Sequence, residues 1–330
     1  MAISAMTSVL TANEWQYAKD IKPGDWVFNR LGQPVRVKTT QMYRAEDCYR
    51  VLFDDYLSID GDKHLAFPSE NQSYRKRVSR YKGVRKRIAQ PTVRSVTKML
   101  DTGLVFRKSR LFFSVPTTEP IQLPHQPLGI PPFLYGFWFF ARRNNSFMQV
   151  PVCYAENVMQ KFKDSGYKVT EMRQLKPEVR RFCTEPSIWD QLKGRQTRTL
   201  PLLYLNGSPE QRFELFQGIF SAKRINVLSK QGYFTIKTRK KYIIMAIQYL
   251  AESLGAKTKL IDNTASNYYQ LDIHRWQPLL PKATTSKPTP HLARRYVKSI
   301  EPIPAQLCVH IETDDSDGSY LAGEGFIACH

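Results

Sequence analysis

Short runs of alternating apolar and polar residues occupy both ends of the chain. Between residues 2 and 67 these runs are separated by turn-forming residues such as Pro23-Gly24-Asp25, and Tyr49–Phe53 alternates before Asp54. The last segment, residues 296–330, has the same character. Alternation with period two, bounded by turn residues, predicts β-strands at both ends.

The middle of the chain has the helical period instead. Phe213, Phe216 and Phe220 fall on one helical face, and a second apolar face runs from Ile244 to Leu254, before Gly255 as a predicted C-cap. We therefore predict a discontinuous all-β domain, residues 1–125 and 289–330, with an α+β domain, residues 126–288, inserted into it.

Composition agrees with two packed domains. A length of 330 residues exceeds one ordinary core, and 42% of the residues are hydrophobic. The longest apolar stretch, residues 133–141, is half as long as a membrane span requires, and no secretion signal precedes it. The five scattered cysteines form no CxxC pair, which predicts neither a disulfide framework nor a zinc site. We expect a cytoplasmic monomer with no membrane partner and no small-molecule substrate.

The formal net charge of +20 is concentrated in the middle of the chain. Residues 126–288 carry 25 basic and 11 acidic side chains, whereas residues 289–330 carry 3 and 6. Such a surplus usually neutralises phosphates, so double-stranded DNA is the expected partner. The alternative is a soluble protein of high pI without a nucleic-acid role.

Five segments together resemble one family of self-processing proteins, the inteins, which splice themselves out of a host protein. They are Val9–Thr11, Ile21–Val27, Leu57–His64, Val309–Asp314 and Tyr320–His330. The resemblance covers essentially the whole chain and implies the all-β Hint fold. It also implies that flanking host segments, the exteins, are partners. The connector before the middle domain is similar to that of inteins in phage terminases and replicative helicases.

The resemblance assigns roles to four positions. Ala2 stands where the family has its first nucleophile, and His64 would protonate the departing amide nitrogen. His330 would assist cleavage at a following Asn, with His310, a position where Asp or Cys is common, as a second proton-transfer group. Gly61 replaces the usual Thr of this block.

Two departures predict that splicing is disabled. Ala2 carries no nucleophile, and the Asn expected after His330 is absent. The chain is expected to be a piece of a longer protein, because it ends on an apolar strand. Two rival interpretations stay open: a stand-alone DNA-binding regulator, and a hedgehog-like autoprocessing domain, against which the His330 end argues.

The middle domain resembles a LAGLIDADG homing endonuclease, a pseudo-two-fold α+β nuclease. Residues 132–143 and 213–224 share one pattern, with Gly136 and Gly218 placed 82 residues apart. The resemblance implies that these glycines let two helices pack closely. Two ordinary amphipathic core helices are the alternative.

The positions that would carry metal-binding Asp residues are Ala141 and Lys223. Neither side chain binds Mg²⁺, so we expect no metal, no cofactor and no cleavage. An active nuclease with displaced metal ligands, which would use Mg²⁺, stays open.

Basic residues predict a DNA-binding surface. Eight lie between residues 75 and 87, within a possible DNA-recognition arm, residues 74–98, whose alternative is a solvated loop. The candidates are Arg75, Lys76, Arg77, Arg80, Lys82, Arg85, Lys86, Arg87, Arg142, Arg143, Arg224, Arg239 and Lys240.

Overall fold

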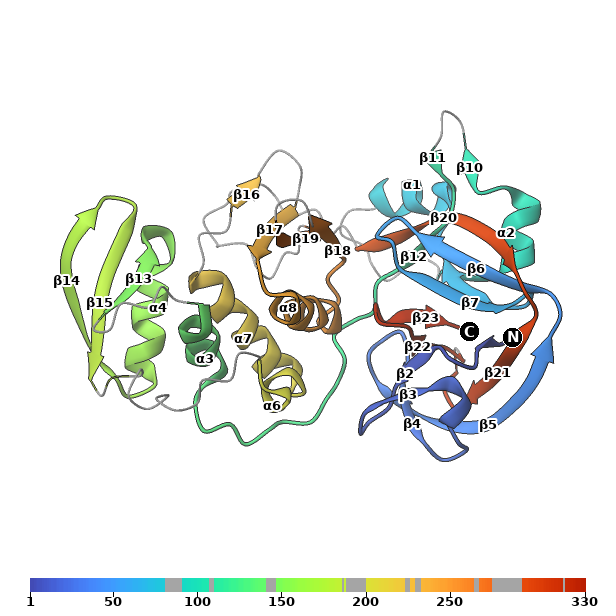
Figure 1. The fold of residues 1–330 in the computed structure, drawn as a ribbon, viewed down its shortest axis with the longest axis horizontal. Helices are drawn as coiled ribbons and strands as arrows, with labels where there is room; N and C mark the ends of the chain where they lie inside the picture. The colour runs from blue at the N-terminus through green and yellow to red at the C-terminus, as the bar shows by residue number, and fades with distance from the viewer. Residues whose placement is uncertain are drawn as a thin grey trace. The chain divides into compact units, whose positions relative to one another are not determined.

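The computed structural model contains two compact units (Figure 1). The first comprises residues 1–122, 255–259 and 276–330, and the second residues 123–254 and 260–275. The structure describes residues 1–80, 91–106, 110–140, 147–185, 187, 200–222, 226–228, 233–263, 267–274, 293–316 and 318–330.

The first unit is built mainly of strands. They are β1 (Ile3–Ser4), β2 (Ser8–Leu10), β3 (Trp15–Tyr17), β4 (Trp26–Phe28), β5 (Pro34–Ala45), β6 (Cys48–Phe53), β7 (Ser58–Asp62), β8 (Ala66–Ser69), β9 (Thr92–Ser95), β10 (Val105–Phe106), β11 (Arg110–Leu111), β12 (Ser114–Pro116), β20 (Arg294–Ile303), β21 (Gln306–Thr313), β22 (Tyr320–Ala322) and β23 (Ile327–Cys329). Its helical elements are η1 (Ala18–Asp20), α1 (Gln72–Arg80) and α2 (Val96–Thr102). The strands predicted near both ends of the chain are confirmed.

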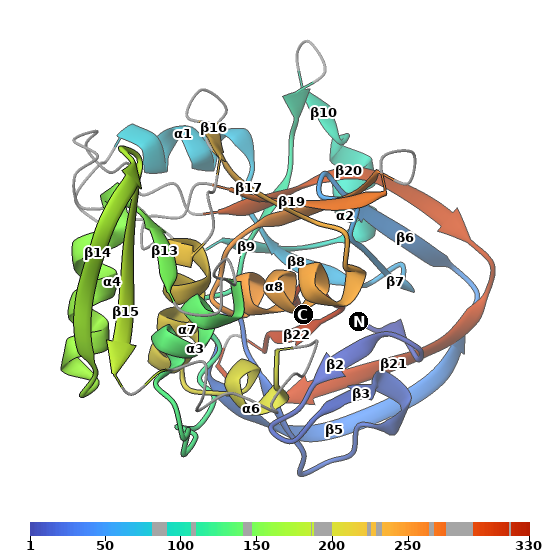
Figure 2. The same cartoon turned by 60° about the vertical axis from the view of Figure 1, so that its left-hand side comes forward.

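Strands from the two ends of the chain pair with each other. The large sheet has the order β12-β20-β6-β7-β1-β21-β5-β4, and a second sheet has the order β23-β22-β2-β3. In the large sheet Ile3 lies between Gly61 of β7 and Val309 of β21. In the second sheet Val9 pairs with Ala322. This pairing brings the first and last residues together, as both views of the ribbon show (Figures 1 and 2).

The alternation along these strands buries one continuous core. In β5, for example, Val35 and Val37 are buried while Pro34, Arg36 and Lys38 are exposed. The same core takes in Val9, Ile59 and Val309, so strands of the first 60 residues and of the last 30 share one apolar interior.

The second unit contains the predicted helices. They are α3 (Pro132–Phe140), α4 (Val152–Asp164), α6 (Leu202–Leu205), α7 (Pro209–Ala222) and α8 (Lys241–Ser253). Its strands are β13 (Met148–Pro151), β14 (Lys168–Lys176), β15 (Val179–Glu185), β16 (Asn226–Leu228), β17 (Tyr233–Thr238), β18 (Thr258–Asn263) and β19 (Tyr268–His274). α8 ends just before Gly255, whose φ of +88° fits the predicted C-cap. No helix among the described residues is long and apolar enough to cross a membrane.

Two similar halves meet at α3 and α7. One half has a sheet of order β13-β15-β14 packed on α4, and the other a sheet of order β16-β17-β19-β18 packed on α8. Gly136 of α3 faces the Leu215 carbonyl, and Gly218 of α7 faces the Phe133 carbonyl. A Cβ at either glycine would collide with the opposite backbone, so this close helix contact requires glycine.

Candidate functional site

The peptide between Met1 and Ala2 is held in the middle of the large sheet. Ala2 is fully buried, and its N–H donates to the Asp62 Oδ1 atom over 3.0 Å. In the other direction the Asp62 backbone N–H donates to the Ala2 carbonyl oxygen, also over 3.0 Å. One residue therefore binds both backbone polar groups of Ala2.

Gly61 makes this approach possible. It pairs with Ile3 across β1 and β7, and a Cβ at Gly61 would collide with the Ala2 carbonyl oxygen. The buried Leu65 side chain closes the other side, 2.9 Å from the same Cβ position. The resemblance implies a Thr at this position, but a Cβ would not fit this backbone.

The carbonyl oxygen of Met1 has its own donor. The Nδ1 atom of His310 lies 2.6 Å from it, and because a carbonyl oxygen only accepts, Nδ1 carries the hydrogen. His310 is half-buried on β21, next to Val309, which pairs with Ile3. The Met1 carbonyl is the group that a nucleophile at residue 2 would attack.

Asp62 is itself fixed by Tyr43 of β5. The Tyr43 hydroxyl donates to Asp62 Oδ2 over 2.7 Å, and the His64 backbone N–H donates to Oδ1 over 3.1 Å. Asp62 is only 3% exposed. Burial, and then the hydrogen bond and negative charge of Asp62, raise the pKa of Tyr43 well above its usual value. The hydroxyl therefore keeps its proton and stays a donor.

The histidines at positions 64 and 330 are placed differently. The His64 side chain is exposed, and Asp62 occupies the place at the Ala2 amide that the resemblance gave to His64. The His330 backbone N–H donates to the Ala66 carbonyl over 3.0 Å, and its half-buried ring lies over Gly318. Both chain ends are thus attached to the segment Gly61–Ala66.

Sequence reasoning missed Asp62 and Tyr43. A carboxylate inside a predicted catalytic block was a signal that could have identified Asp62. Tyr43 gave no such signal, because only strand pairing brings β5, through β21, beside β1.

Two buried thiols complete the surroundings of Ala2. Cys48 and Cys308 form a small cluster with Ala2 and Ala45. Burial, together with neighbouring Cys48, raises the pKa of the Cys308 thiol to about 12. A thiol in this environment stays protonated, so Cys308 does not supply a nucleophile in place of residue 2.

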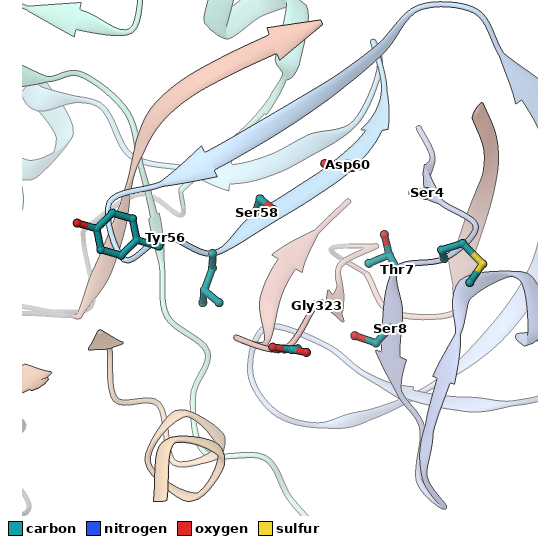
Figure 3. Close-up of a pocket in the computed structure, with 10 residues that line it drawn as sticks. Ser4, Thr7, Ser8, Tyr56, Ser58, Asp60 and Gly323 are labelled. Atoms are coloured by element: carbon teal, nitrogen blue, oxygen red, sulfur yellow. The ribbon is translucent and has the colours of Figure 1, made fainter. Parts of the chain in front are cut away.

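A polar cavity of about 390 Å³ lies further along the same strands. Figure 3 shows Thr7 and Ser8 on one side of it, and Ser58 and Asp60 of β7 on the other. Ser4 also lines it, two residues after Ala2. Neither Met1 nor Ala2 lines this cavity, so it is separate from the contacts on the Met1–Ala2 peptide.

The predicted nuclease positions fall mostly outside the described residues. This holds for Ala141, Arg142, Arg143, Lys223 and Arg224. In the described parts of the chain, no group of three or more His, Cys, Asp or Glu side chains could hold a metal ion. Arg239 and Lys240 are exposed where α8 begins.

The predicted DNA-recognition arm begins within α1, where Arg75 has internal partners. Its guanidinium donates to the Glu70 carbonyl, the Ser114 hydroxyl and the Leu111 carbonyl within 3.1 Å. It also lies over the Tyr296 ring. Burial lowers the pKa of Arg75, which is a consequence of its internal position. Arg75 therefore fastens α1 to the β unit, and a role of Arg75 in DNA binding stays a prediction.

The other predicted residues of the arm are exposed or undescribed. Lys76 is exposed on α1. The side chains of Arg77 and Arg80, and the whole of Lys82, Arg85, Lys86 and Arg87, lie outside what the structure describes.

Comparison with known proteins gives structural likenesses only. No protein-family model and no curated protein sequence matches the chain. The Msm DnaB1 intein splicing domain bound with zinc is similar over 99% of this chain and 98% of its own, with a TM-score of 0.31 and 10% identity. The gp41-1 intein is similar over 34% of this chain and 73% of its own, with a TM-score of 0.23 and 16% identity.

A homing endonuclease is similar to a smaller part. The structure of I-DmoI in complex with DNA and Mn covers 44% of this chain and 89% of its own, with a TM-score of 0.31 and 12% identity. At these identities and TM-scores the likenesses establish neither a family nor an activity. The predicted architecture is confirmed by the structure itself: a discontinuous β unit, in which strands of both chain ends pair, with an inserted α+β unit of two similar halves.

Proposed function

We propose that this chain is an intein whose splicing site is the Met1–Ala2 peptide and the adjoining His330. The observation that carries the proposal is that residues far apart in the sequence meet at this peptide. His310 Nδ1 lies 2.6 Å from the Met1 carbonyl oxygen, although 309 residues separate them in sequence. The His330 backbone is attached to the segment Gly61–Ala66, which also holds Ala2. A stand-alone DNA-binding protein has no need for this arrangement.

The contacts suit the first step of splicing. A thiol or hydroxyl on residue 2 would attack the Met1 carbonyl carbon, and negative charge would develop on its oxygen. The Nδ1–H of His310 points at that oxygen and would stabilise the charge. Ala2 has no such nucleophile, so the chain with Ala2 holds the peptide intact. His330 would then assist cleavage at an Asn placed after it.

Restoring both reacting groups tests the proposal. The chain, with Ala2→Cys and with an Asn and a downstream Cys, Ser or Thr following His330, is placed between two reporter proteins. We expect ligated reporters and a free chain of about 38.3 kDa. The matched control keeps Ala2 and should give no ligated product. Intact precursor with every downstream nucleophile would refute the proposal.

We propose that the inserted unit binds double-stranded DNA without cutting it. The balance of +14 over residues 126–288 and the exposed Arg239 and Lys240 support binding. Ala141 and Lys223 support the absence of cleavage, because neither offers an anionic oxygen to a metal. Retention of duplex DNA should fall steeply between 50 and 200 mM salt, by roughly a hundredfold or more. Specific double-strand breaks in the uninterrupted host gene with Mg²⁺ or Mn²⁺ would contradict the proposed absence of cleavage.

A further inference from the structure

Asp62 contacts the atom that must leave in the first splicing step. That step breaks the bond between the Met1 carbonyl carbon and the Ala2 nitrogen, and Asp62 Oδ1 lies 3.0 Å from this nitrogen. The family resemblance assigned this place to His64, whose side chain is exposed instead. A buried carboxylate on a reacting nitrogen needs an explanation, because burying a charge is costly unless it is bound.

We propose that Asp62 is a catalytic residue of the N-terminal cleavage, and that Tyr43 positions it. The inference rests on the proposed splicing function. Asp62 binds the leaving nitrogen more strongly as that nitrogen gains a proton and positive charge, and Tyr43 holds the carboxylate in the orientation that makes this possible.

The step balances without an outside reactant. With Ala2→Cys, the thiol sulfur bonds to the Met1 carbonyl carbon, and an electron pair moves to the oxygen beside His310. The thiol proton passes to the amide nitrogen, the carbonyl re-forms, and the carbon–nitrogen bond breaks. The products are a thioester and the free α-amine of residue 2, which takes a further proton from water near neutral pH.

A carboxylate favours the products of this step over the starting peptide. A neutral amide N–H already makes a charge-assisted hydrogen bond to Asp62 Oδ1, and an ammonium adds to it the attraction between two opposite full charges. Only an interaction that strengthens along the reaction speeds it. The Asp62 backbone N–H keeps the Ala2 carbonyl fixed meanwhile, so the nitrogen leaves from a defined position.

Tyr43 acts through Asp62 and not on the peptide. Its hydroxyl donates to Oδ2 over 2.7 Å, which leaves Oδ1 for the Ala2 and His64 N–H groups. The raised pKa of Tyr43 is consistent with a hydroxyl that remains a donor. The competing interpretation is structural: Asp62 merely closes the turn to His64.

The test uses the full chain with Ala2→Cys between two reporters, and measures cleavage at residue 2 by added dithiothreitol. Asp62→Asn keeps the shape and an acceptor oxygen but removes the charge. We expect it to slow N-terminal cleavage by at least about tenfold. Asp60→Asn is the matched control, since Asp60 lies two residues away on β7 and pairs with Arg50 at 2.7 Å. It should leave the rate within about twofold, as for a surface ion pair.

Tyr43→Phe should slow N-terminal cleavage by about threefold, and adding it to Asp62→Asn should cause little further loss, because both act through one contact. Cleavage after an Asn appended to His330 is the control for correct folding. Its rate should be unchanged in all variants. Unchanged N-terminal cleavage in Asp62→Asn, or an equal loss of both cleavages, would overturn the inference. If the Ala2→Cys parent itself forms no thioester, the proposed function fails instead.

Discussion

Replacing Gly61 by alanine adds one methyl group at the closest approach between β7 and the peptide to be cleaved. The new Cβ would collide with the Ala2 carbonyl oxygen, and it would lie 2.9 Å from Cδ2 and 3.2 Å from Cβ of Leu65. Leu65 is fully buried and has no free space to enter. Strand β1 must therefore move away from β7 at Ala2.

The expected cost follows from these contacts. Overpacking a filled interior costs about 1–3 kcal/mol. Losing the hydrogen bond from the Asp62 N–H to the Ala2 carbonyl adds about 1 kcal/mol. The positive-φ glycines do not include Gly61, so alanine can adopt its backbone conformation and restricts the unfolded chain, which returns about 0.5–1 kcal/mol. We expect a net destabilisation of about 1–3.5 kcal/mol for the β unit.

Cleavage should suffer more than stability. A displacement of the Ala2 nitrogen and the Met1 carbonyl by about 1 Å would reduce the rate roughly a hundredfold, because Asp62 and His310 would no longer meet both ends of one peptide. The assays are urea unfolding of the chain, and thiol-induced cleavage in the Ala2→Cys background. Gly129→Ala is the control, since nothing lies within 4 Å of its added Cβ. Wild-type stability together with a wild-type cleavage rate in Gly61→Ala would refute this reasoning.

Four further outcomes follow from single side chains. In the Ala2→Cys background, His310→Ala should slow thiol-induced N-terminal cleavage by about 10²-fold, because the Met1 oxygen loses its donor. Arg75→Ala should destabilise the β unit by about 2–3 kcal/mol in urea without changing the salt dependence of DNA retention, whereas the exposed Lys76→Ala should leave stability unchanged. Alkylation of the folded chain should label exposed Cys153 and spare buried Cys308. Because folding raises the pKa of Cys308 to about 12, its contribution to stability should be complete below about pH 9 and be lost between pH 9 and 12, measurable as a falling urea midpoint.

Much of the fold could be predicted because local pattern and buried face coincide. The alternation in Tyr49–Phe53 gave β6, and the apolar face from Ile244 to Leu254 gave α8, since both elements bury one face in a core. Gly136 and Gly218 could be read as a helix contact from their equal places in two similar segments. The division of the chain was less readable: residues 255–259 pack with the β unit, where Lys257 binds Asp54 at 2.6 Å.

Arg75 illustrates why side-chain roles within a charged run could not be predicted. Eight basic residues among the thirteen of residues 75–87 suggest one charged surface, yet burial depends on which helical face meets the β unit. Arg75 lies on the face of α1 that meets the Glu70 and Leu111 carbonyls, so its guanidinium makes hydrogen bonds inside the β unit. Its neighbour Lys76 is exposed. Composition gives the charge of a segment, but only tertiary contacts decide which charges remain for a partner.

Gly61 departs from the Thr that the resemblance implies, and the neighbouring Asp62 carries the proposed chemistry. A Thr at position 61 would bring a hydroxyl to the site, but its Cβ would push the Ala2 carbonyl away. Glycine removes the hydroxyl and lets β1 approach β7 until the Asp62 carboxylate reaches the Ala2 N–H. Glycine at position 61 is thus compatible with the hydrogen bond between Asp62 and the Ala2 N–H, which a larger residue would disturb. Gly61 and Asp62 should therefore be interdependent: once Gly61→Ala has displaced the peptide, Asp62→Asn should cause little additional loss of N-terminal cleavage. Independent, multiplicative losses would show that Asp62 does not act on the peptide that Gly61 admits.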